Sequence, residues 1–194
     1  MVEYDATTAL VVVDVQNDFA DPDGSLSVPG AVDIVAAVNQ QIAAAVAAGA
    51  PCVYTQDWHP PRTPHFAKDG GPWPVHCVRD TWGAELVSGL DVVGPVVRKG
   101  SGGEDGYSGF TVRDPRTGAA RPTELEEMLR SNGVRRVVVV GLATDYCVKE
   151  TALDAARLGF TTIVLRDAVR AVNVDAADGE RAFVAMAEAG VTVS

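Results

Sequence analysis

Short apolar runs recur along the chain and set its organisation. A strand that is covered on both faces has no polar alternation, so a continuous apolar run of roughly four to eight residues indicates a parallel strand inside a sheet. The sequence predicts such strands at residues 8–15, 51–56, 92–98, 136–141, 161–166 and 191–193.

Helical segments lie between most of these runs. The first, residues 32–48, is rich in alanine and closes at Gly49, a residue suited to the left-handed conformation that ends a helix. The second begins at Thr123 with a Thr-Glu-Leu-Glu capping-box pattern and ends near Gly133. The last two are predicted at residues 144–158 and 175–189, each followed by a glycine.

Alternation of strand and helix predicts a three-layer α/β/α fold around a mainly parallel, six-stranded, doubly wound sheet. The 194 residues, of which 47% are hydrophobic and 22% charged, suit a single domain that spans residues 1–194. In such folds ligand groups collect beyond the carboxyl ends of the strands.

Charge and composition exclude several classes of partner. The formal net charge of -10 opposes binding to nucleic acid or to an anionic membrane surface. No apolar run reaches the length of a membrane span, and residues 1–5 lack the basic, then apolar, pattern of a secretion signal. Three widely spaced cysteines argue for reduced thiols. We therefore expect a cytoplasmic protein, and the sequence leaves open whether it forms a homo-oligomer.

Reactive side chains fall at four predicted strand ends. Asp14 closes the first strand, Asp57 follows the second, Lys99 follows the third, and Cys147 lies at the start of the helix after the fourth. The irregular stretches at residues 57–82 and 100–122 are longer than usual connections, which indicates that they shape a site.

Cys147 is a candidate nucleophile. A helix start presents positive partial charge and unpaired N–H groups, which favour a thiolate and can hold an oxyanion. Asp14 would accept the thiol proton, and Lys99 would stabilise the charge pair. Taken singly, Cys147 reads as a buried apolar residue, Asp14 as a helix cap and Lys99 as a surface charge, but their joint placement at strand ends favours chemistry.

All three histidines, His59, His65 and His76, fall within eighteen residues and follow Asp57 closely. A single histidine is more often structural, but three of them with a carboxylate beyond a strand end predict a site for a divalent transition metal ion such as Zn²⁺, Fe²⁺ or Mn²⁺. Cys77 is a further candidate ligand, although an inward-pointing His76 would turn it away. Cys52 is predicted to lie in the core.

Five segments together resemble a known family. They are residues 13–19 (Val-Asp-Val-Gln-Asn-Asp-Phe), 57–59 (Asp-Trp-His), 73–77 (Trp-Pro-Val-His-Cys), 99–100 (Lys-Gly) and 141–148 (Gly-Leu-Ala-Thr-Asp-Tyr-Cys-Val). The chain resembles the nicotinamidase and pyrazinamidase branch of the isochorismatase-like cysteine hydrolases over essentially its whole length. The Asp-x-His segment and the later histidine mark the metal-dependent branch.

The resemblance implies a catalytic triad of Asp14, Lys99 and Cys147. It implies Asp57, His59 and His76 as metal ligands, with His65 matching the additional ligand of the mycobacterial-type enzymes, a position that other members fill with water or another side chain. It further implies a cis peptide bond between Leu142 and Ala143 and an oxyanion hole formed by the N–H groups of Ala143 and Cys147. Aromatic residues would enclose a flat ring: Phe19, Trp73, Tyr107 and Tyr146.

The implied reaction is hydrolysis of nicotinamide to nicotinate and ammonia through a cysteine thioester, in NAD salvage, with pyrazinamide as a related ring carboxamide. One departure from the family is the glycine-rich stretch at residues 100–106, which leaves the placement of Tyr107 open. Two alternatives also stay open. One is a different amidase or an isochorismatase that acts on a vinyl ether, although such relatives generally lack the metal cluster. The other is a metal-binding or regulatory module on an inactive scaffold.

Overall fold

The computed structural model describes residues 2–194 and contains the expected parallel sheet. Neighbouring strands lie in the order β3-β2-β1-β6-β7-β8, and every neighbouring pair is parallel. The strands are β1 (Thr8–Val13), β2 (Cys52–Asp57), β3 (Val96–Lys99), β6 (Arg136–Leu142), β7 (Thr161–Arg170) and β8 (Thr192–Val193). The prediction of a doubly wound six-stranded sheet is confirmed.

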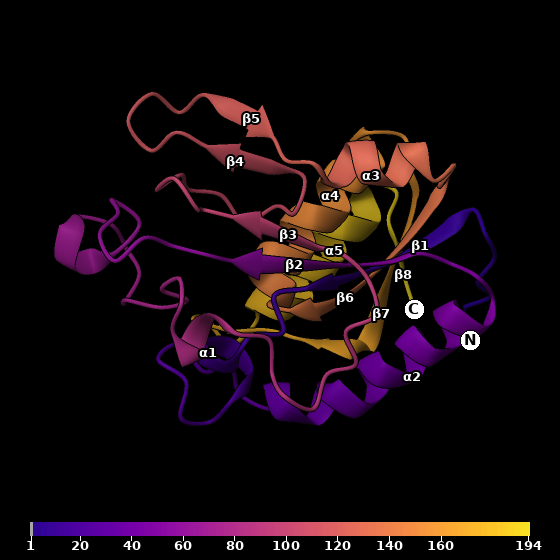
Figure 1. Ribbon diagram of the computed structural model, residues 1–194, viewed down its shortest axis with the longest axis horizontal. Coiled ribbons are helices and arrows are strands. Elements are labelled where there is room, and N and C mark those ends of the chain that lie inside the picture. Colours follow the sequence, from indigo (N-terminus) through magenta and orange to yellow (C-terminus); the bar gives the residue numbers. More distant parts are fainter. Residues whose placement is uncertain (1) are drawn as a thin grey trace.

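Helices cover both faces of this sheet. Figure 1 shows α2 (Ile34–Ala47) on one side, with α3 (Leu125–Ser131) and α4 (Lys149–Arg157) on the other. The last helix, α5 (Asp178–Glu188), belongs to the same layer as α4. All six residues of β1 are buried, and they alternate between two apolar clusters. Leu10 and Val12 pack in the cluster that contains α2, whereas Val11 and Val13 pack in the cluster that contains the other three helices.

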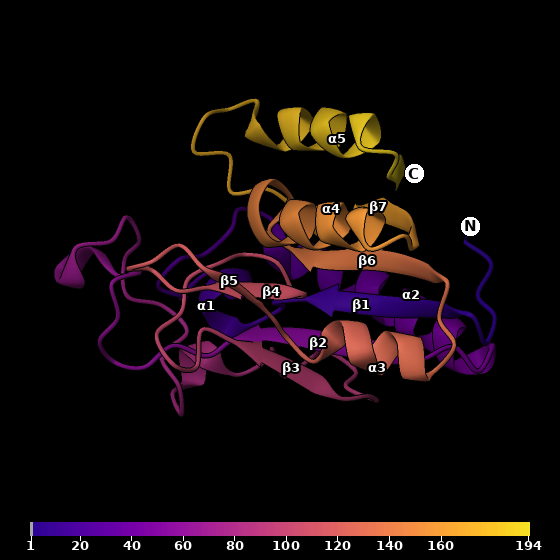
Figure 2. The same ribbon diagram turned by 90° about the horizontal axis from the view of Figure 1, so that it is seen from above.

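The strand order reverses between β1 and β6, which makes their carboxyl ends a topological switch point. Val13, the last residue of β1, pairs in register with Thr55 of β2 and Gly141 of β6, so these three strands end close to one another. Figure 2 shows the strands side by side, with the long loops gathered beyond one end of the sheet. The loops that carry the candidate site residues therefore meet at this switch point.

Several predicted boundaries differ from the structure. The third strand begins at Val96 rather than at residue 92, because the backbone groups of Asp91 and Val93 bond to the side-chain hydroxyl of Tyr54 rather than to the backbone of β2. The predicted helix at residues 144–158 has two parts, a π-helical turn at Thr144–Val148 and then α4. β7 continues to Arg170 through a shift in its pairing with β6.

Regular elements also lie inside the stretches that were predicted to be irregular. Within residues 100–122 an antiparallel hairpin joins β4 (Thr111–Arg113) to β5 (Ala120–Pro122). Outside those stretches, a short helix that was not predicted, α1 (Asn17–Ala20), follows the first strand. β5 is fully exposed, so the hairpin has no apolar pattern that could reveal it. Within residues 2–194, no helix is both long enough and apolar enough to cross a membrane.

Candidate active site at the switch point

Asp14, Lys99 and Cys147 meet beyond the strand ends. Asp14 directly follows β1 with φ at 48°, Lys99 is the last residue of β3, and Cys147 lies in the π-helical turn after β6. The Lys99 ammonium lies 2.9 Å from Asp14 Oδ2 and 3.6 Å from the Cys147 sulfur. All three side chains are buried. The sequence predicts these residues at the ends of separate strands. In the folded chain Lys99 contacts both Asp14 and Cys147.

Lys99 also pairs with a second carboxylate. Asp57 is its register partner across β2 and β3, and Lys99 Nζ donates a hydrogen bond to Asp57 Oδ1. Asp14, Asp57 and Cys147 offer ligand atoms close enough together to hold a cation, and the ammonium fills that position. Burial lowers the pKa of Lys99, but the two carboxylates and the cysteine outweigh it and raise the pKa well above its ordinary value. Lys99 is therefore the fixed cation of the site.

The environment of Cys147 keeps its resting sulfur protonated. Burial raises the pKa of the Cys147 thiol well above its usual value, and the nearby Lys99 charge opposes this effect. Burial also raises the pKa of Asp14, against the Lys99 charge and a 2.6 Å hydrogen bond from the Thr55 hydroxyl to Asp14 Oδ1. Asp14 Oδ2 has no hydrogen bond within residues 2–194 beyond its ion pair with Lys99. That oxygen is free to accept a proton from the thiol.

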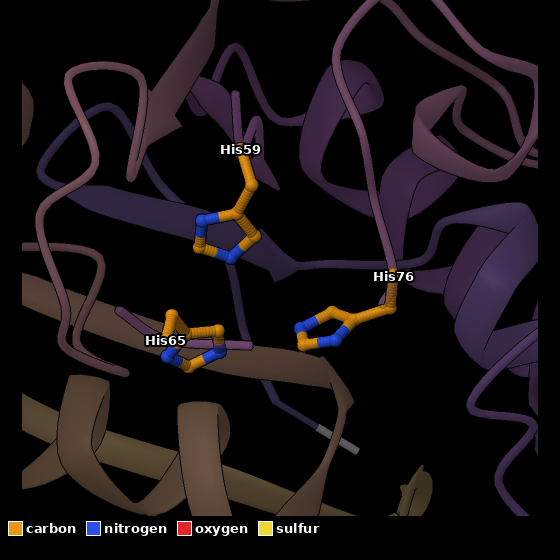
Figure 3. Close-up of side chains that lie close together, drawn as sticks. All are labelled: His59, His65 and His76. Carbon is orange, nitrogen blue, oxygen red and sulfur yellow. The ribbon is translucent and has the colours of Figure 1, made fainter. Parts of the chain in front are cut away.

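The three histidines converge in front of this group. Figure 3 shows the imidazoles of His59, His65 and His76 facing a common centre. Their ring centroids lie 4.7 to 5.3 Å apart, and one nitrogen from each lies within 4.8 Å of the others. All three residues are buried. The predicted grouping of histidines is present in the structure.

Hydrogen bonds fix which nitrogen each outer histidine presents. His76 Nδ1 lies 2.7 Å from the Pro74 carbonyl oxygen, and His65 Nδ1 lies 2.8 Å from Asp105 Oδ1. Both partners accept a hydrogen bond, so each Nδ1 carries a proton and each Nε2 presents its lone pair. Burial lowers the pKa of His76 to about 4, partly opposed by Asp57, which keeps this imidazole neutral. Neutral imidazoles are the form that binds a metal.

His59 supplies the observation that most directly indicates a cation. Both of its ring nitrogens are buried, and neither has a hydrogen-bond partner within residues 2–194. A buried polar atom without a partner costs about 1–3 kcal/mol, so such atoms are expected to have a ligand. The donor set of three imidazoles and one carboxylate suits a borderline divalent metal ion. The residues present therefore fit the metal that the sequence implies.

Asp57 connects the two halves of the site. Its Oδ1 accepts from Lys99, while its Oδ2 lies 3.8 Å from His59 Nε2. Burial alone raises the pKa of Asp57, but the Lys99 and His59 contributions outweigh it and hold the pKa well below the ordinary range. The Gln16 side chain clamps the Asp57 backbone, accepting from its N–H at 2.8 Å and donating to its carbonyl at 2.7 Å.

An aromatic pocket opens beside Cys147. Trp73 lies edge-on to Tyr146, with centroids 5.0 Å apart, and its Nε1–H donates to the Tyr107 hydroxyl at 3.0 Å. This hydrogen bond fixes the position of the Tyr107 side chain, which the sequence left open because a glycine-rich stretch precedes it. The pocket is lined by Phe19, Leu26, Val28, Asp57, His65, Trp73, His76, Tyr107, Ala143, Tyr146, Cys147 and Val172. Cys147, the aromatic residues and two of the three histidines, His65 and His76, thus line one cavity.

Other features of the site carry weaker sequence signals. The peptide bond between Leu142 and Ala143 is cis, as the family resemblance implied. Cys77 is buried but points toward the Gly83 carbonyl, 3.9 Å away, and not among the histidines, so it is not a ligand candidate. Sequence reasoning missed Gln16, Thr55 and Asp105, whose partners are remote in the chain. Of these three residues, only Gln16 lies in a segment that resembles the family, and the resemblance implies no role for it.

Fold and site together define a three-layer α/β/α protein with a buried cysteine, lysine and aspartate at the switch point of its sheet. The Isochorismatase domain model matches residues 8–194, and the chain belongs to this family.

Individual relatives agree with this assignment. The chain is 37% identical to the nicotinamidase of Escherichia coli over 203 aligned residues, which cover 95% of this chain and 93% of that protein. Among solved structures it is similar to the pyrazinamidase of Pyrococcus horikoshii in complex with zinc, with a TM-score of 0.86, 41% identity and coverage of 97% and 98%. A structure from L. infantum in complex with nicotinate superposes with a TM-score of 0.87, 37% identity and coverage of 100% and 95%.

Proposed function

We propose that the protein is a nicotinamidase that hydrolyses nicotinamide to nicotinate and ammonia and serves NAD salvage. The observation that carries this proposal is the shared cavity: Cys147, an aromatic wall and two of the three grouped histidines, His65 and His76, line one pocket. A nucleophile without the histidines would suit many amides. The histidines beside it add a site that can recognise a ring nitrogen, and the E. coli and P. horikoshii relatives support that substrate class.

In the proposed mechanism Asp14 takes the proton of the Cys147 thiol. The sulfur then attacks the carboxamide carbon. Lys99 stabilises the negative charge as it moves from Asp14 to the sulfur, because its ammonium lies 2.9 Å from Asp14 Oδ2 and 3.6 Å from the Cys147 sulfur. Asp14 returns the proton to the amide nitrogen, the C–N bond breaks, and ammonia leaves a thioester on Cys147. A water then gives a proton to Asp14 and attacks the thioester carbon, the C–S bond breaks, and Asp14 returns that proton to the leaving Cys147 sulfur, which restores the thiol; the acid released ionises to nicotinate.

The oxyanion of each tetrahedral intermediate needs hydrogen-bond donors. We assign this role to the backbone N–H groups of Ala143 and Cys147, because both residues border the pocket at the start of the helical segment that follows β6. One such donor contributes about 3 kcal/mol to stabilisation of the transition state.

We assign the metal to His59, His65, His76 and the Oδ2 side of Asp57. When bound, the ion supplies a Lewis acid that holds and orients the pyridine nitrogen. The chain's own residues complete the recognition. Phe19 and Trp73 offer faces to a flat heteroaromatic ring, and Tyr107 and Tyr146 close the remaining wall.

The proposal is tested by incubating metal-replete protein with nicotinamide and measuring nicotinate and ammonia, with benzamide as the matched control. Benzamide has the same carboxamide but no ring nitrogen, so we expect fast turnover of nicotinamide and much slower turnover of benzamide. Equal turnover would overturn recognition of the ring nitrogen and indicate a different amidase of the family. No turnover of either amide, with metal bound, would favour the metal-binding module on an inactive scaffold.

A further inference from the structure

One contact to the three histidines comes from a residue to which the proposed mechanism assigns no role. Asp105 lies in the glycine-rich stretch between β3 and β4, forty positions from His65, and its Oδ1 lies 2.8 Å from His65 Nδ1. His65 is buried, whereas the Asp105 side chain is 39% exposed. A carboxylate with access to water does not need a histidine as partner, so the contact serves the histidine rather than the aspartate.

Asp105 is itself held firmly. Its backbone forms a two-way bridge to Arg113 of β4, through N–H to carbonyl contacts of 2.7 and 2.6 Å. Its Oδ1 also accepts the Gly106 N–H at 2.8 Å. The β4–β5 hairpin thereby fixes where this carboxylate points, and the carboxylate in turn fixes the imidazole.

We propose that Asp105 is a positioning residue for the metal centre. By accepting the Nδ1 proton it holds His65 in one tautomer and one ring orientation, with Nε2 directed at His59 and His76. A carboxylate behind a ligating imidazole also makes the imidazole a stronger ligand. This inference rests on the metal site of the proposed function. It adds that the fourth protein ligand, His65, depends on the loop between β3 and β4 and not only on the loop that carries the histidines.

The adjacent residue provides a matched control. Glu104 lies in the same loop and has the same charge, but its carboxylate binds Arg121 of β5 at 3.0 Å and the Gly102 N–H at 2.7 Å. Glu104→Gln and Asp105→Asn each remove one negative charge from this loop, so both change the long-range electrostatic potential at the histidines to a similar extent. Only the second weakens the contact to His65.

The experiment measures the affinity of the apo protein for Co²⁺ by competition with a chromophoric chelator, together with the visible spectrum of the Co²⁺ form. Removing the partner behind a ligand commonly lowers metal affinity about 10–100-fold. We expect a loss of that size in Asp105→Ala, a smaller loss in Asp105→Asn, which keeps an acceptor oxygen, and the parent affinity in Glu104→Gln. The spectrum of Asp105→Ala should shift toward that of His65→Ala.

A double-mutant cycle separates positioning from a general effect on the loop. If Asp105 acts through His65, adding Asp105→Ala to His65→Ala causes no further loss of affinity. The same loss in both backgrounds, or a parent-like affinity and spectrum in Asp105→Ala, would overturn the inference while leaving the proposed function intact. A parent protein that binds no Co²⁺ would overturn the metal site and this inference together. Thermal unfolding of the apo proteins establishes whether each variant is folded. If Asp105→Ala does not fold, the metal affinity of Asp105→Asn is compared with that of the parent instead.

Discussion

The Lys99 ammonium lies 3.6 Å from the Cys147 sulfur, and the two residues are separated by forty-eight positions in the chain. β2 lies between β3 and β1 in the sheet, and the long Lys99 side chain reaches from the last residue of β3 to Asp14, which follows β1. Its charge is compensated by Asp14 and Asp57, so one cation contacts both the proposed nucleophile and the carboxylate that faces the histidines.

Replacing Lys99 by methionine should damage both folding and activity. The change keeps the apolar stem but leaves two buried carboxylates without their cation, which costs about 3–5 kcal/mol of stability. We expect a matching loss in the free energy of unfolding by urea, and turnover at least a hundredfold below that of the parent. Lys68→Met is the control, because the Lys68 side chain is 42% exposed and its ion pair with Asp69 should contribute less than about 1 kcal/mol. Parent-like stability of Lys99→Met would contradict the buried charge network.

Gly100 is predicted to be essential for the metal site. A Cβ at this position would lie 2.6 Å from His59 Nδ1 and Cε1, and the backbone has φ at +77°. Gly118 has a similar φ of +72° but no atom within 4 Å of its Cβ position. Alanine at either position should cost about 1–2 kcal/mol through backbone strain. Only Gly100→Ala should also displace His59 and lower metal affinity, by at least about tenfold. Equal metal affinities in the two variants would show that His59 tolerates the added methyl group.

Removing the metal should act mainly on substrate binding. Dialysis against a chelator, followed by calorimetric titration with nicotinamide, should reveal a large loss of affinity that returns when Zn²⁺, Fe²⁺ or Mn²⁺ is added back. The reason is that the pyridine nitrogen loses its partner while the aromatic wall and Cys147 stay in place. Unchanged nicotinamide affinity in the metal-free protein would refute the assigned role of the histidines.

Trp73 should contribute through both its ring and its N–H group. Trp73→Phe keeps an aromatic face but loses the 3.0 Å hydrogen bond to Tyr107, and we expect KM to rise by about fivefold, equivalent to about 1 kcal/mol. Trp73→Ala removes the face as well, so KM should rise by more than about tenfold. Tyr107→Phe removes the same hydrogen bond from the other side and should match Trp73→Phe. A parent-like KM in Trp73→Ala would show that the pyridine ring of the substrate binds elsewhere in the pocket, away from Trp73.

The sheet was predictable because its strands are buried on both faces and therefore carry continuous apolar runs. The Asp14, Lys99 and Cys147 group was predictable for a related reason: parallel strands place their carboxyl ends together, so reactive residues just beyond those ends must meet. The histidines were predictable because they are close in sequence.

Other parts depend on contacts that no local pattern records. β4 is short and half-buried and β5 is short and exposed, so their hairpin lacks the apolar alternation that marks a strand. Asp105 faces His65 only because the hairpin returns its loop to the histidines. Thr55 lies within an apolar strand and looks like an ordinary core residue, yet its hydroxyl binds Asp14. Such residues act through partners about forty positions away, and only the fold identifies those partners.

The central claim is that Cys147 carries the acyl group of nicotinamide during turnover. The most direct measurement is acid quenching of the parent protein during turnover of nicotinamide, followed by mass spectrometry of its peptides, with Cys147→Ala treated in parallel. We predict a nicotinoyl group on the peptide that contains Cys147 in the parent, and neither that adduct nor ammonia release in the variant. Release of ammonia by Cys147→Ala at the parent rate would contradict the account.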